Sequence, residues 1–228
     1  MKCERKNPWF YRRGSKFYEI VHHLNTLWTD NKYRKIVAEE AEIKKGDRVL
    51  EVGTGTGLTA IEAVLTQTNC TVTSIDISAD MLGRALGNIR NRGLGNEIKF
   101  VRGDVADLPF SSSSFERIIS CYGLGGVENI RRAFEEMVRV ATPGAIICVA
   151  EIVEPPPEYP IRRFLHKYFA EPLFVKGIWG FRDLDLLSLF RESGIKVTKS
   201  RYFTEKVFGS TMLVIGVVEK SGTGKESC

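Results

Sequence analysis

A hydrophobic stretch that runs into three closely spaced glycines constrains this chain more than any other feature. Val49 to Val52 reads as a short buried strand, and Gly53, Gly55 and Gly57 follow it directly. Glycine permits positive φ and lets a ligand approach the backbone, and amides at the start of the next helix attract polar groups. The spacing is GxGxG, because Leu58 stands where the dinucleotide pattern GxGxxG needs its third glycine. The pattern predicts a ligand-binding turn between a strand and a helix.

The rest of the chain alternates predicted strands and helices. Strands are predicted over residues 47–52, 71–76, 98–102, 115–121 and 145–151, and helices over 15–28, 33–41, 57–67, 79–91, 128–140 and 183–193. Such alternation predicts a parallel sheet with helices on both faces. Two last strands, 195–202 and 211–220, suggest an antiparallel C-terminal hairpin. We therefore expect a doubly wound, Rossmann-like α/β fold with a seven-stranded, mostly parallel sheet.

Local signals set several of these boundaries. Ser78 and Asp183 are the predicted N-caps of the helices that follow them. Pro143-Gly144 is predicted to end the helix before the fifth strand, and Gly194 the helix before the hairpin.

Length and composition predict one domain. The chain has 228 residues, of which 43% are hydrophobic and 27% charged, so a globular domain is expected and a disordered chain is excluded. Four parts are expected: a helical cap over residues 1–45, a cofactor-binding core over 46–152, a lid or substrate insert over 153–182, and a helix with hairpin over 183–220.

Membrane-spanning, secreted and metal-binding classes are not favoured. The longest stretch without charged residues has 13 residues, from Ala63 to Ile75, whereas a spanning helix needs about 20. Met1 to Lys16 has no apolar core and does not read as a secretory signal. The five cysteines are widely spaced without a CxxC pair, and none lies near the three histidines. We expect a cytoplasmic protein with no metal site, whose net charge of +5 permits contact with anionic lipid or nucleic acid.

Acidic residues follow the next two strands. Asp76 ends the second strand, 19 residues after Gly57, where a carboxylate can accept hydrogen bonds from ribose hydroxyls. Asp104 follows the third strand and is placed to reach an adenine amino group, with Leu108 to Phe110 as an apolar wall. The structural alternatives are that Asp76 only caps the next helix and that Asp104 is only a turn residue.

Several stretches together resemble the class I S-adenosylmethionine-dependent methyltransferases. They are Glu51 to Gly57, Ile75 to Ser78, Gly103 to Phe110, and Glu136 to Val140 running into Pro143-Gly144. Within that class the chain is most similar to the ubiquinone/menaquinone biosynthesis C-methyltransferase family. Tyr122-Gly123-Leu124 followed by Val127 is similar to that family's Phe-Gly-Leu-x-Asn-Val signature, and Gly125-Gly126 stand where the family has Arg-Asn.

The resemblance implies S-adenosylmethionine as the cofactor and residues that contact it. Motif-matched positions are Thr56, Asp76, Asp104, Val105 and Cys121, and the same loops add Glu51, Gly53, Thr54, Gly55, Gly57, Ile77, Met81 and Gly103. It also implies ring C-methylation of a demethylated isoprenoid quinone precursor.

A ring carbon becomes a good nucleophile only when the adjacent phenol ionises, so a base or a positive site is expected. Glu151, Tyr122 and His22 are the predicted catalytic residues, with His23 and His166 as further candidates. Each has a structural alternative: an ion-paired strand end for the glutamate, a packed ring for the tyrosine, and a core position for each histidine.

The segment after the fifth strand is the candidate lid. Residues 155–157 are three prolines, and apolar residues at 161, 164, 165, 168 and 169 have helical spacing, with basic residues between them. A basic amphipathic helix can lie on a membrane or cover an apolar substrate. We expect peripheral membrane contact through residues 160–170, with an ordinary helix packed on the core as the alternative. A homodimer is the expected assembly.

Three other functions stay open. Another small molecule or lipid, such as a phospholipid amine, a sterol or a metabolite hydroxyl, is the main alternative acceptor. A nucleic-acid methyltransferase is disfavoured, because Tyr122-Gly123-Leu124 stands where such enzymes carry an Asn/Asp-Pro-Pro-aromatic motif. No nucleic-acid partner is expected. A cofactor-binding subunit without activity is disfavoured by the intact glycine loop and Asp76.

Overall fold

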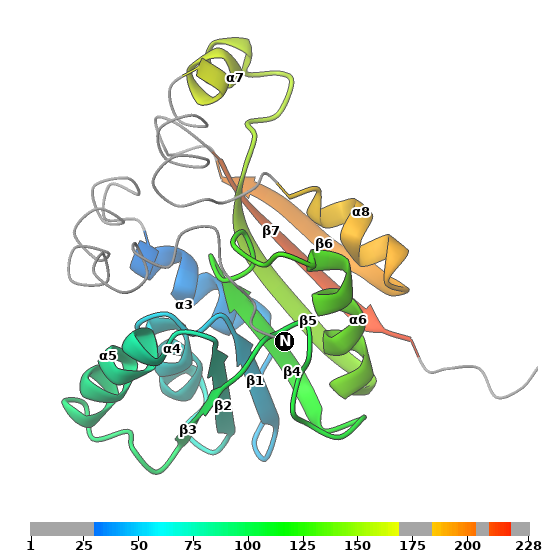
Figure 1. The fold of residues 1–228 in the computed structure, drawn as a ribbon. Helices are drawn as coiled ribbons and strands as arrows, with labels where there is room; N and C mark the ends of the chain where they lie inside the picture. The colour runs from blue at the N-terminus through cyan, green and yellow to red at the C-terminus, as the bar shows by residue number, and fades with distance from the viewer. Residues whose placement is uncertain (1–29, 169–183, 204–209, 220–228) are drawn as a thin grey trace, which may run out of the picture.

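Seven strands form one sheet in the computed structural model, which describes residues 30–168, 184–203 and 210–219 (Figure 1). The strands are β1 (Arg48–Val52), β2 (Thr71–Asp76), β3 (Ile98–Arg102), β4 (Phe115–Cys121), β5 (Ala141–Val153), β6 (Ile195–Phe203) and β7 (Ser210–Val218). Their order in the sheet is β3-β2-β1-β4-β5-β7-β6. The order reverses between β1 and β4, which is where doubly wound sheets bind ligands.

The pairing of the strands confirms the predicted sheet. The neighbours from β3 to β5 pair in parallel, whereas β7 is antiparallel to both β5 and β6. Strands β1 and β4 are buried along nearly their whole length, as expected of central strands covered on both faces. The carboxyl ends of the parallel strands therefore lie at one edge of the sheet, and the loops that follow them meet there.

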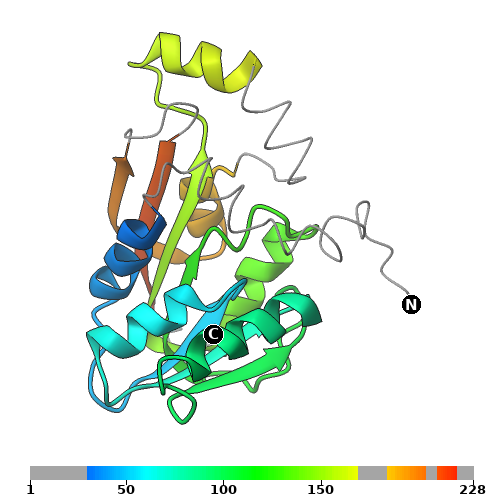
Figure 2. The ribbon, with the colours of Figure 1, turned by 90° about the vertical axis from the view of Figure 1, so that its left-hand side faces the viewer.

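Helices cover both faces of the sheet, as predicted (Figures 1 and 2). They are α3 (Asp30–Glu40), α4 (Leu58–Thr66), α5 (Ala79–Arg90), α6 (Ile130–Val140), α7 (Pro160–Leu165) and α8 (Leu186–Glu192). One core lies under α3, α4 and α5, with Tyr33 and Ile61 among its residues. The other lies under α6 and α8, where the rings of Phe134 and Phe190 meet edge to face, 5.4 Å between centroids.

The caps of two helices test the local predictions. Ser78 is the N-cap of α5 as predicted, and its Oγ accepts a hydrogen bond from the Met81 amide at 3.4 Å. The prediction for α8 was wrong by two residues. Its N-cap is Asp185, not Asp183, and the Asp185 carboxylate accepts bonds from the Ser188 amide (3.1 Å) and hydroxyl (2.7 Å).

The boundary between α6 and β5 also differs from the prediction. Helix α6 ends at Val140, and β5 begins at once with Ala141 rather than at position 145. The register against β4 shifts here, since Phe115 pairs with Ala141 but Arg117 pairs with Ile146. Pro143 and Gly144 lie in this irregular start of the strand, where Gly144 has a φ of 85°. The pair that was expected to precede the strand is therefore part of it.

Strand β5 is also longer than predicted at its other end, since it runs to Val153 instead of 151. The chain then reaches α7, a helix of six residues followed by a π-helical turn to Tyr168. The predicted helix at 15–28 lies outside the described residues, and the domain boundaries at 45, 152 and 182 stay predictions. Within the described ranges no helix is long and apolar enough to cross a membrane, and no cluster of side chains could hold a metal ion.

Candidate active site

The backbones of two loops touch where the strand order reverses. Gly53, after β1, has a φ of 72°, and a Cβ placed on it would lie 2.5 Å from the Cα of Gly123, after β4. A Cβ on Gly123 would in turn lie 2.6 Å from the Val52 carbonyl oxygen. Only glycine fits at both positions without pushing the strand ends apart. The first glycine of the predicted loop thus fixes how closely β1 and β4 approach at this edge.

Asp76 ties the glycine loop to the end of β2. Its Oδ2 accepts a hydrogen bond from the Gly55 amide at 2.9 Å, and its Oδ1 accepts one from the Ser78 amide at 2.8 Å. The carboxylate is half-buried, and each of its oxygens can accept more than one hydrogen bond. Asp76 therefore shapes the loop through main-chain bonds and keeps acceptor capacity for ligand hydroxyls.

The two threonines of the loop are buried, and the hydroxyl of one of them lacks a hydrogen-bond partner within the described residues. The Thr54 side chain is 1% exposed, and its Oγ1 has no hydrogen-bond partner within the described part of the protein. Thr56 is 3% exposed, and its carbonyl oxygen accepts a bond from the Asn88 side chain at 3.0 Å. A buried hydroxyl without a partner is costly, so Thr54 fits a site that a polar ligand completes.

Gly57 has a structural role at the start of α4, and its contact with the cofactor stays a prediction. It is the N-cap of α4 with a φ of 79°, and a Cβ there would lie 2.9 Å from the Cβ of Ala85 in α5. The third glycine therefore lets α4 and α5 pack closely. In the same region Ile77 is 36% exposed beyond Asp76, whereas the Met81 side chain is buried against the core.

The loop after β3 continues the same edge. The Gly103 amide donates to the Asp76 carbonyl oxygen at 3.1 Å, and a Cβ on Gly103 would lie 2.8 Å from the Ile75 side chain. Asp104 is exposed, and its Oδ1 accepts a bond from the Ala106 amide at 2.9 Å. Val105 is buried beside it. Asp104 is thus a turn residue, as the structural alternative held. Its exposed carboxylate can still accept further hydrogen bonds from a ligand.

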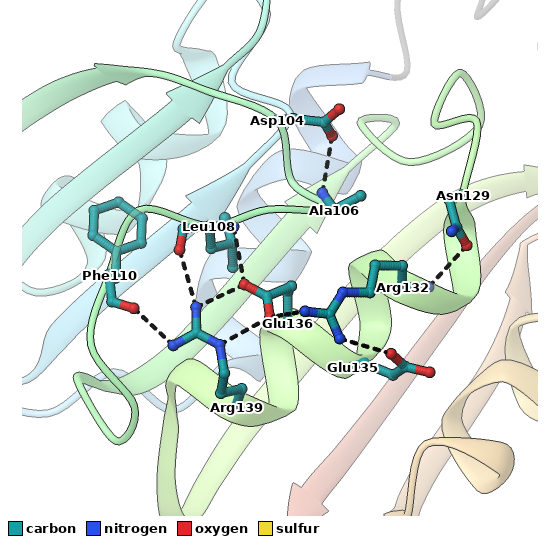
Figure 3. Close-up of polar contacts among 9 residues, drawn as sticks. All are labelled: Asp104, Ala106, Leu108, Phe110, Asn129, Arg132, Glu135, Glu136 and Arg139. Atoms are coloured by element: carbon teal, nitrogen blue, oxygen red, sulfur yellow. Dashed lines mark hydrogen bonds and ion pairs between the residues drawn. The ribbon is translucent and has the colours of Figure 1, made fainter. Parts of the chain in front are cut away.

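A clamp from α6 holds the apolar wall in place (Figure 3). Glu136 Oε2 accepts a bond from the Leu108 amide at 3.0 Å, while Arg139 donates to the Leu108 and Phe110 carbonyl oxygens at 2.9 and 2.8 Å. Arg132 and Arg139 also pair with the Glu136 carboxylate at 3.0 and 2.6 Å. These bonds, first that to Arg139, hold the pKa of Glu136 below its usual range.

The clamp was not assigned by sequence reasoning. Glu136 and Arg139 were noted only as part of the family resemblance. The available signal was the spacing of Glu136, which stands three residues after Ala133 and four before Val140 on the apolar face of α6, where a charge needs partners.

Glu51 lies beneath the loop, inside the protein. It is 1% exposed, and its carboxylate accepts bonds from the Ala60 amide of α4 (3.1 Å) and the Ser74 hydroxyl of β2 (2.7 Å). Burial raises the pKa of Glu51 to about 7, although these bonds and the nearby Arg34 act in the opposite direction. The structure thus places Glu51 where it joins β1, β2 and α4, and its contact with the cofactor stays a prediction.

Cys121 ends β4, and Tyr122 follows it, directly before Gly123. Both side chains are buried in the core under α3 and α4. Tyr122 has a φ of 60°, an uncommon conformation for a bulky residue, and its hydroxyl is 2.9 Å from the Thr211 hydroxyl. Tyr33 packs edge-on against its ring, 6.4 Å between centroids. Tyr122 is thus a packed core ring, as its structural alternative held. Its hydroxyl partner, Thr211, was not indicated by the sequence.

Glu151 holds the loop that follows β4. It is 2% exposed, and its Oε1 accepts a hydrogen bond from the Leu124 amide at 2.6 Å. It lies within β5, opposite Met212 of β7, and not at the end of the strand. Among the histidines, His166 is buried at the end of α7, and His22 and His23 lie outside the described residues. Catalytic roles for Glu151, Tyr122 and His22 stay predictions.

Together these contacts bring the loops after β1, β2, β3 and β4 into one site at the carboxyl edge. Main-chain glycines, an orphan hydroxyl and a half-buried carboxylate fit an adenosine-bearing cofactor better than a metal ion. These features define the class of protein as a nucleoside-cofactor enzyme of the doubly wound kind.

Comparison with known proteins identifies the family. The model of the family described as "Methyltransferase domain" matches residues 43–173. A demethylmenaquinone methyltransferase of Porphyromonas gingivalis is 30% identical, and the match covers 77% of this chain and 72% of that relative. A ubiquinone/menaquinone biosynthesis C-methyltransferase, UbiE, of Bdellovibrio bacteriovorus is 31% identical over 73% of this chain and 66% of its own.

Solved structures agree on the fold. A SAM-dependent methyltransferase from Aquifex aeolicus superimposes with a TM-score of 0.62 at 18% identity, covering 81% of this chain and 89% of its own. The chain belongs to the methyltransferase-domain family. The resemblance to class I methyltransferases is thereby confirmed, and S-adenosylmethionine is the cofactor of this enzyme.

Replacing Glu51 by Gln is expected to flatten the dependence of stability on pH. Because burial raises the pKa of Glu51 from 4.5 to about 7, the folded state keeps a proton that the unfolded chain releases. The stability from this group is full below the unfolded pKa and is lost as the pH rises through the folded one, roughly 3 kcal/mol in all. Urea unfolding at about pH 5 and about pH 8 measures the loss of stability in the wild type and in Glu51→Gln. Equal losses in the two proteins would contradict the raised pKa of Glu51.

Replacing Asp76 by Ala is expected to weaken S-adenosylmethionine binding by about 100-fold or more, because hydrogen bonds to a charged group contribute roughly 1.5–3 kcal/mol each. Calorimetric titration measures the affinity, and thermal unfolding checks that the fold stays cooperative. Asp80→Ala removes a neighbouring exposed carboxylate and serves as the matched control. Unchanged affinity in the Asp76 variant would contradict the prediction that Asp76 binds the ribose hydroxyls.

Replacing Glu151 separates an anchoring role from a proton-accepting one. Glu151→Ala leaves the Leu124 amide without its acceptor and is expected to slow turnover about 10- to 100-fold. Glu151→Gln keeps an acceptor oxygen and is expected to stay within about threefold of the wild type, with an unchanged pH profile. Steady-state kinetics across pH measures both. If the Gln variant is as slow as the Ala variant, Glu151 acts as a base.

Proposed function

We propose that this enzyme transfers the methyl group of S-adenosylmethionine to a ring carbon of a demethylated isoprenoid quinone in its reduced, hydroxyl-bearing form. The observation that carries the proposal is the match of about 30% identity to relatives named for demethylmenaquinone and for ubiquinone/menaquinone C-methylation. The match spans most of the described core and is not confined to the glycine loop. A quinone of this type is lipid-borne, so the enzyme would work from the cytoplasm, peripheral to the membrane.

The cofactor, when bound, supplies a methyl group that is already activated on a sulfonium sulfur. The protein therefore has mainly to bind, align and exclude water, and alignment alone can lower a barrier by about 7–11 kcal/mol. In this chain the Asp76 carboxylate would accept hydrogen bonds from the ribose hydroxyls. Thr54 Oγ1 offers a further hydrogen-bonding group in the glycine loop. Leu108, held by the Glu136 clamp, would wall the adenine.

The acceptor would lie against the loop after β4. The start of that loop is fixed twice, by the glycine contact at Gly123 and by the Glu151 bond to the amide of the next residue, Leu124. Methylation forms one carbon–carbon bond, breaks the carbon–sulfur bond of the donor, and releases the ring proton and S-adenosylhomocysteine. His22, outside the described residues, remains the predicted base for the acceptor hydroxyl, because the carboxylate of Glu151 and the hydroxyl of Tyr122 are hydrogen-bonded inside the protein.

Identification of the methylated product tests this function. The full chain is incubated with methyl-labelled S-adenosylmethionine and a chemically reduced demethylated naphthoquinone that carries a short prenyl chain. We expect one labelled methyl per acceptor, located by NMR on the ring carbon next to a hydroxyl, and loss of product in Asp76→Ala. Label on oxygen or nitrogen, or turnover only with a phospholipid amine or a sterol, would overturn the quinone assignment.

A further inference from the structure

Half of the large hydrophobic side chains that are strongly exposed in the described residues lie within one segment of ten. Tyr159 is 41% exposed, Ile161 76%, Phe164 56% and Tyr168 58%. We call these four side chains the α7 patch. The other exposed large hydrophobics, Leu65, Ile77, Leu86 and Tyr202, are scattered over separate elements. A concentration of this kind on one helix and its flanks indicates an interaction surface.

The helix that carries the patch stands apart from the rest of the protein. Figures 1 and 2 show α7 beyond the carboxyl end of β5, away from the helices that cover the sheet. His166 is 1% exposed, so this segment also has a buried side. Ile161, Phe164 and Tyr168 are spaced three and four residues apart and form a stripe on the outer side.

Basic side chains flank the stripe. The Arg162 guanidinium lies 5.9 Å from the centre of the Tyr159 ring, and the Lys167 ammonium lies 5.9 Å from that of Tyr168. Arg162 and Lys167 thus place positive charge beside two rings of the patch, while Arg163 pairs with Glu154 at 2.7 Å. Aromatic rings with cations at their edge suit the boundary of an anionic bilayer, where rings lie at headgroup depth and cations meet phosphates.

Strand β5 connects the active site to the segment that carries the patch. Glu151 of β5 anchors the loop after β4, and Tyr159 follows only eight residues later, at most about 28 Å along an extended chain. The carboxyl end of β5 lies at the same edge of the sheet as those of β1 to β4. A membrane that receives the patch is therefore near the edge from which an acceptor would enter.

We propose that the α7 patch docks this protein on the surface of an anionic phospholipid bilayer. The purpose of the contact rests on the proposed function, since it would let the acceptor ring reach the site while its tail stays in the membrane. A few rings and one aliphatic side chain cannot hold a protein permanently on a bilayer. The binding is therefore expected to be weak, reversible and sensitive to salt.

Vesicle flotation of the full chain tests the apolar part of the contact. We expect binding to vesicles of phosphatidylcholine mixed with phosphatidylglycerol, and about tenfold or weaker binding for Ile161→Ser with Phe164→Ser. Leu65→Ser with Leu86→Ser removes exposed leucines elsewhere and serves as the matched control. Equal binding of the wild type and the α7 variant would overturn the proposal.

Replacing charges tests the electrostatic part. Arg162→Gln with Lys167→Gln is expected to weaken binding to the mixed vesicles and to leave the residual binding to pure phosphatidylcholine unchanged. Lys35→Gln with Lys196→Gln, two exposed lysines on α3 and β6, is the control for net charge. Equal losses in both charge variants would show that overall charge, not the patch, binds the lipid, and would overturn the proposal.

Two further measurements separate this inference from the proposed function and from self-association. Turnover of the short-chain acceptor without vesicles is expected to be the same in the wild type and the α7 variant. Failure of that turnover in the wild type would contradict the proposed function while vesicle binding stands. Light scattering measures the molar mass of the protein without lipid. A wild-type dimer that dissociates in the Ile161 and Phe164 variant would assign the patch to a second copy of the chain and overturn the bilayer proposal.

Discussion

The approach of two glycine backbones is the constraint on which the rest of the site depends. Gly53 and Gly123 lie so close that a Cβ on either would meet the other loop within 3 Å. The contact sets the separation of β1 and β4 where the strand order reverses. Asp76 ties the end of β2 to the glycine loop, and the Gly103 amide ties the loop after β3 to Asp76 in turn. The binding surface is thus built first from main chain, which explains why side chains of the glycine loop are small or buried.

Carboxylates that accept main-chain amides fix the loops around that contact. The pairs are Glu51 with Ala60, Asp76 with Gly55, Glu136 with Leu108, and Glu151 with Leu124. A buried or half-buried carboxylate is stable only when its hydrogen bonds are made, so each pair resists displacement of the loop or helix that donates the amide. The same device has two electrostatic outcomes. Paired arginines hold the pKa of Glu136 low, whereas burial raises that of Glu51 to about 7.

Sequence alone predicted what depends on local pattern and missed what depends on distant partners. The alternation of strands and helices, the reading of the last strands as an antiparallel hairpin and the Ser78 cap follow from periodicity and cap chemistry, and the structure confirms them. The Glu136 clamp joins residues 28 positions apart, and the Tyr122 to Thr211 contact spans 89. No local pattern specifies such pairs. The early start of β5 has the same origin, because the register with β4 sets it and the helix-breaking Pro143 does not.

The same distinction explains why the cofactor half of the site is easier to read than the acceptor half. The predicted cofactor contacts are largely main chain and strand-end carboxylates, so their signature survives in short motifs. After β4 this chain has Gly125-Gly126, which bring no side chain to the acceptor. Under the proposed function, selectivity would come from elements around that loop, and Glu151 is the described residue bonded to it. A loop held rigid by one strand, and a membrane-facing patch carried by its continuation, would let the protein orient a lipid-borne ring without many direct side-chain contacts.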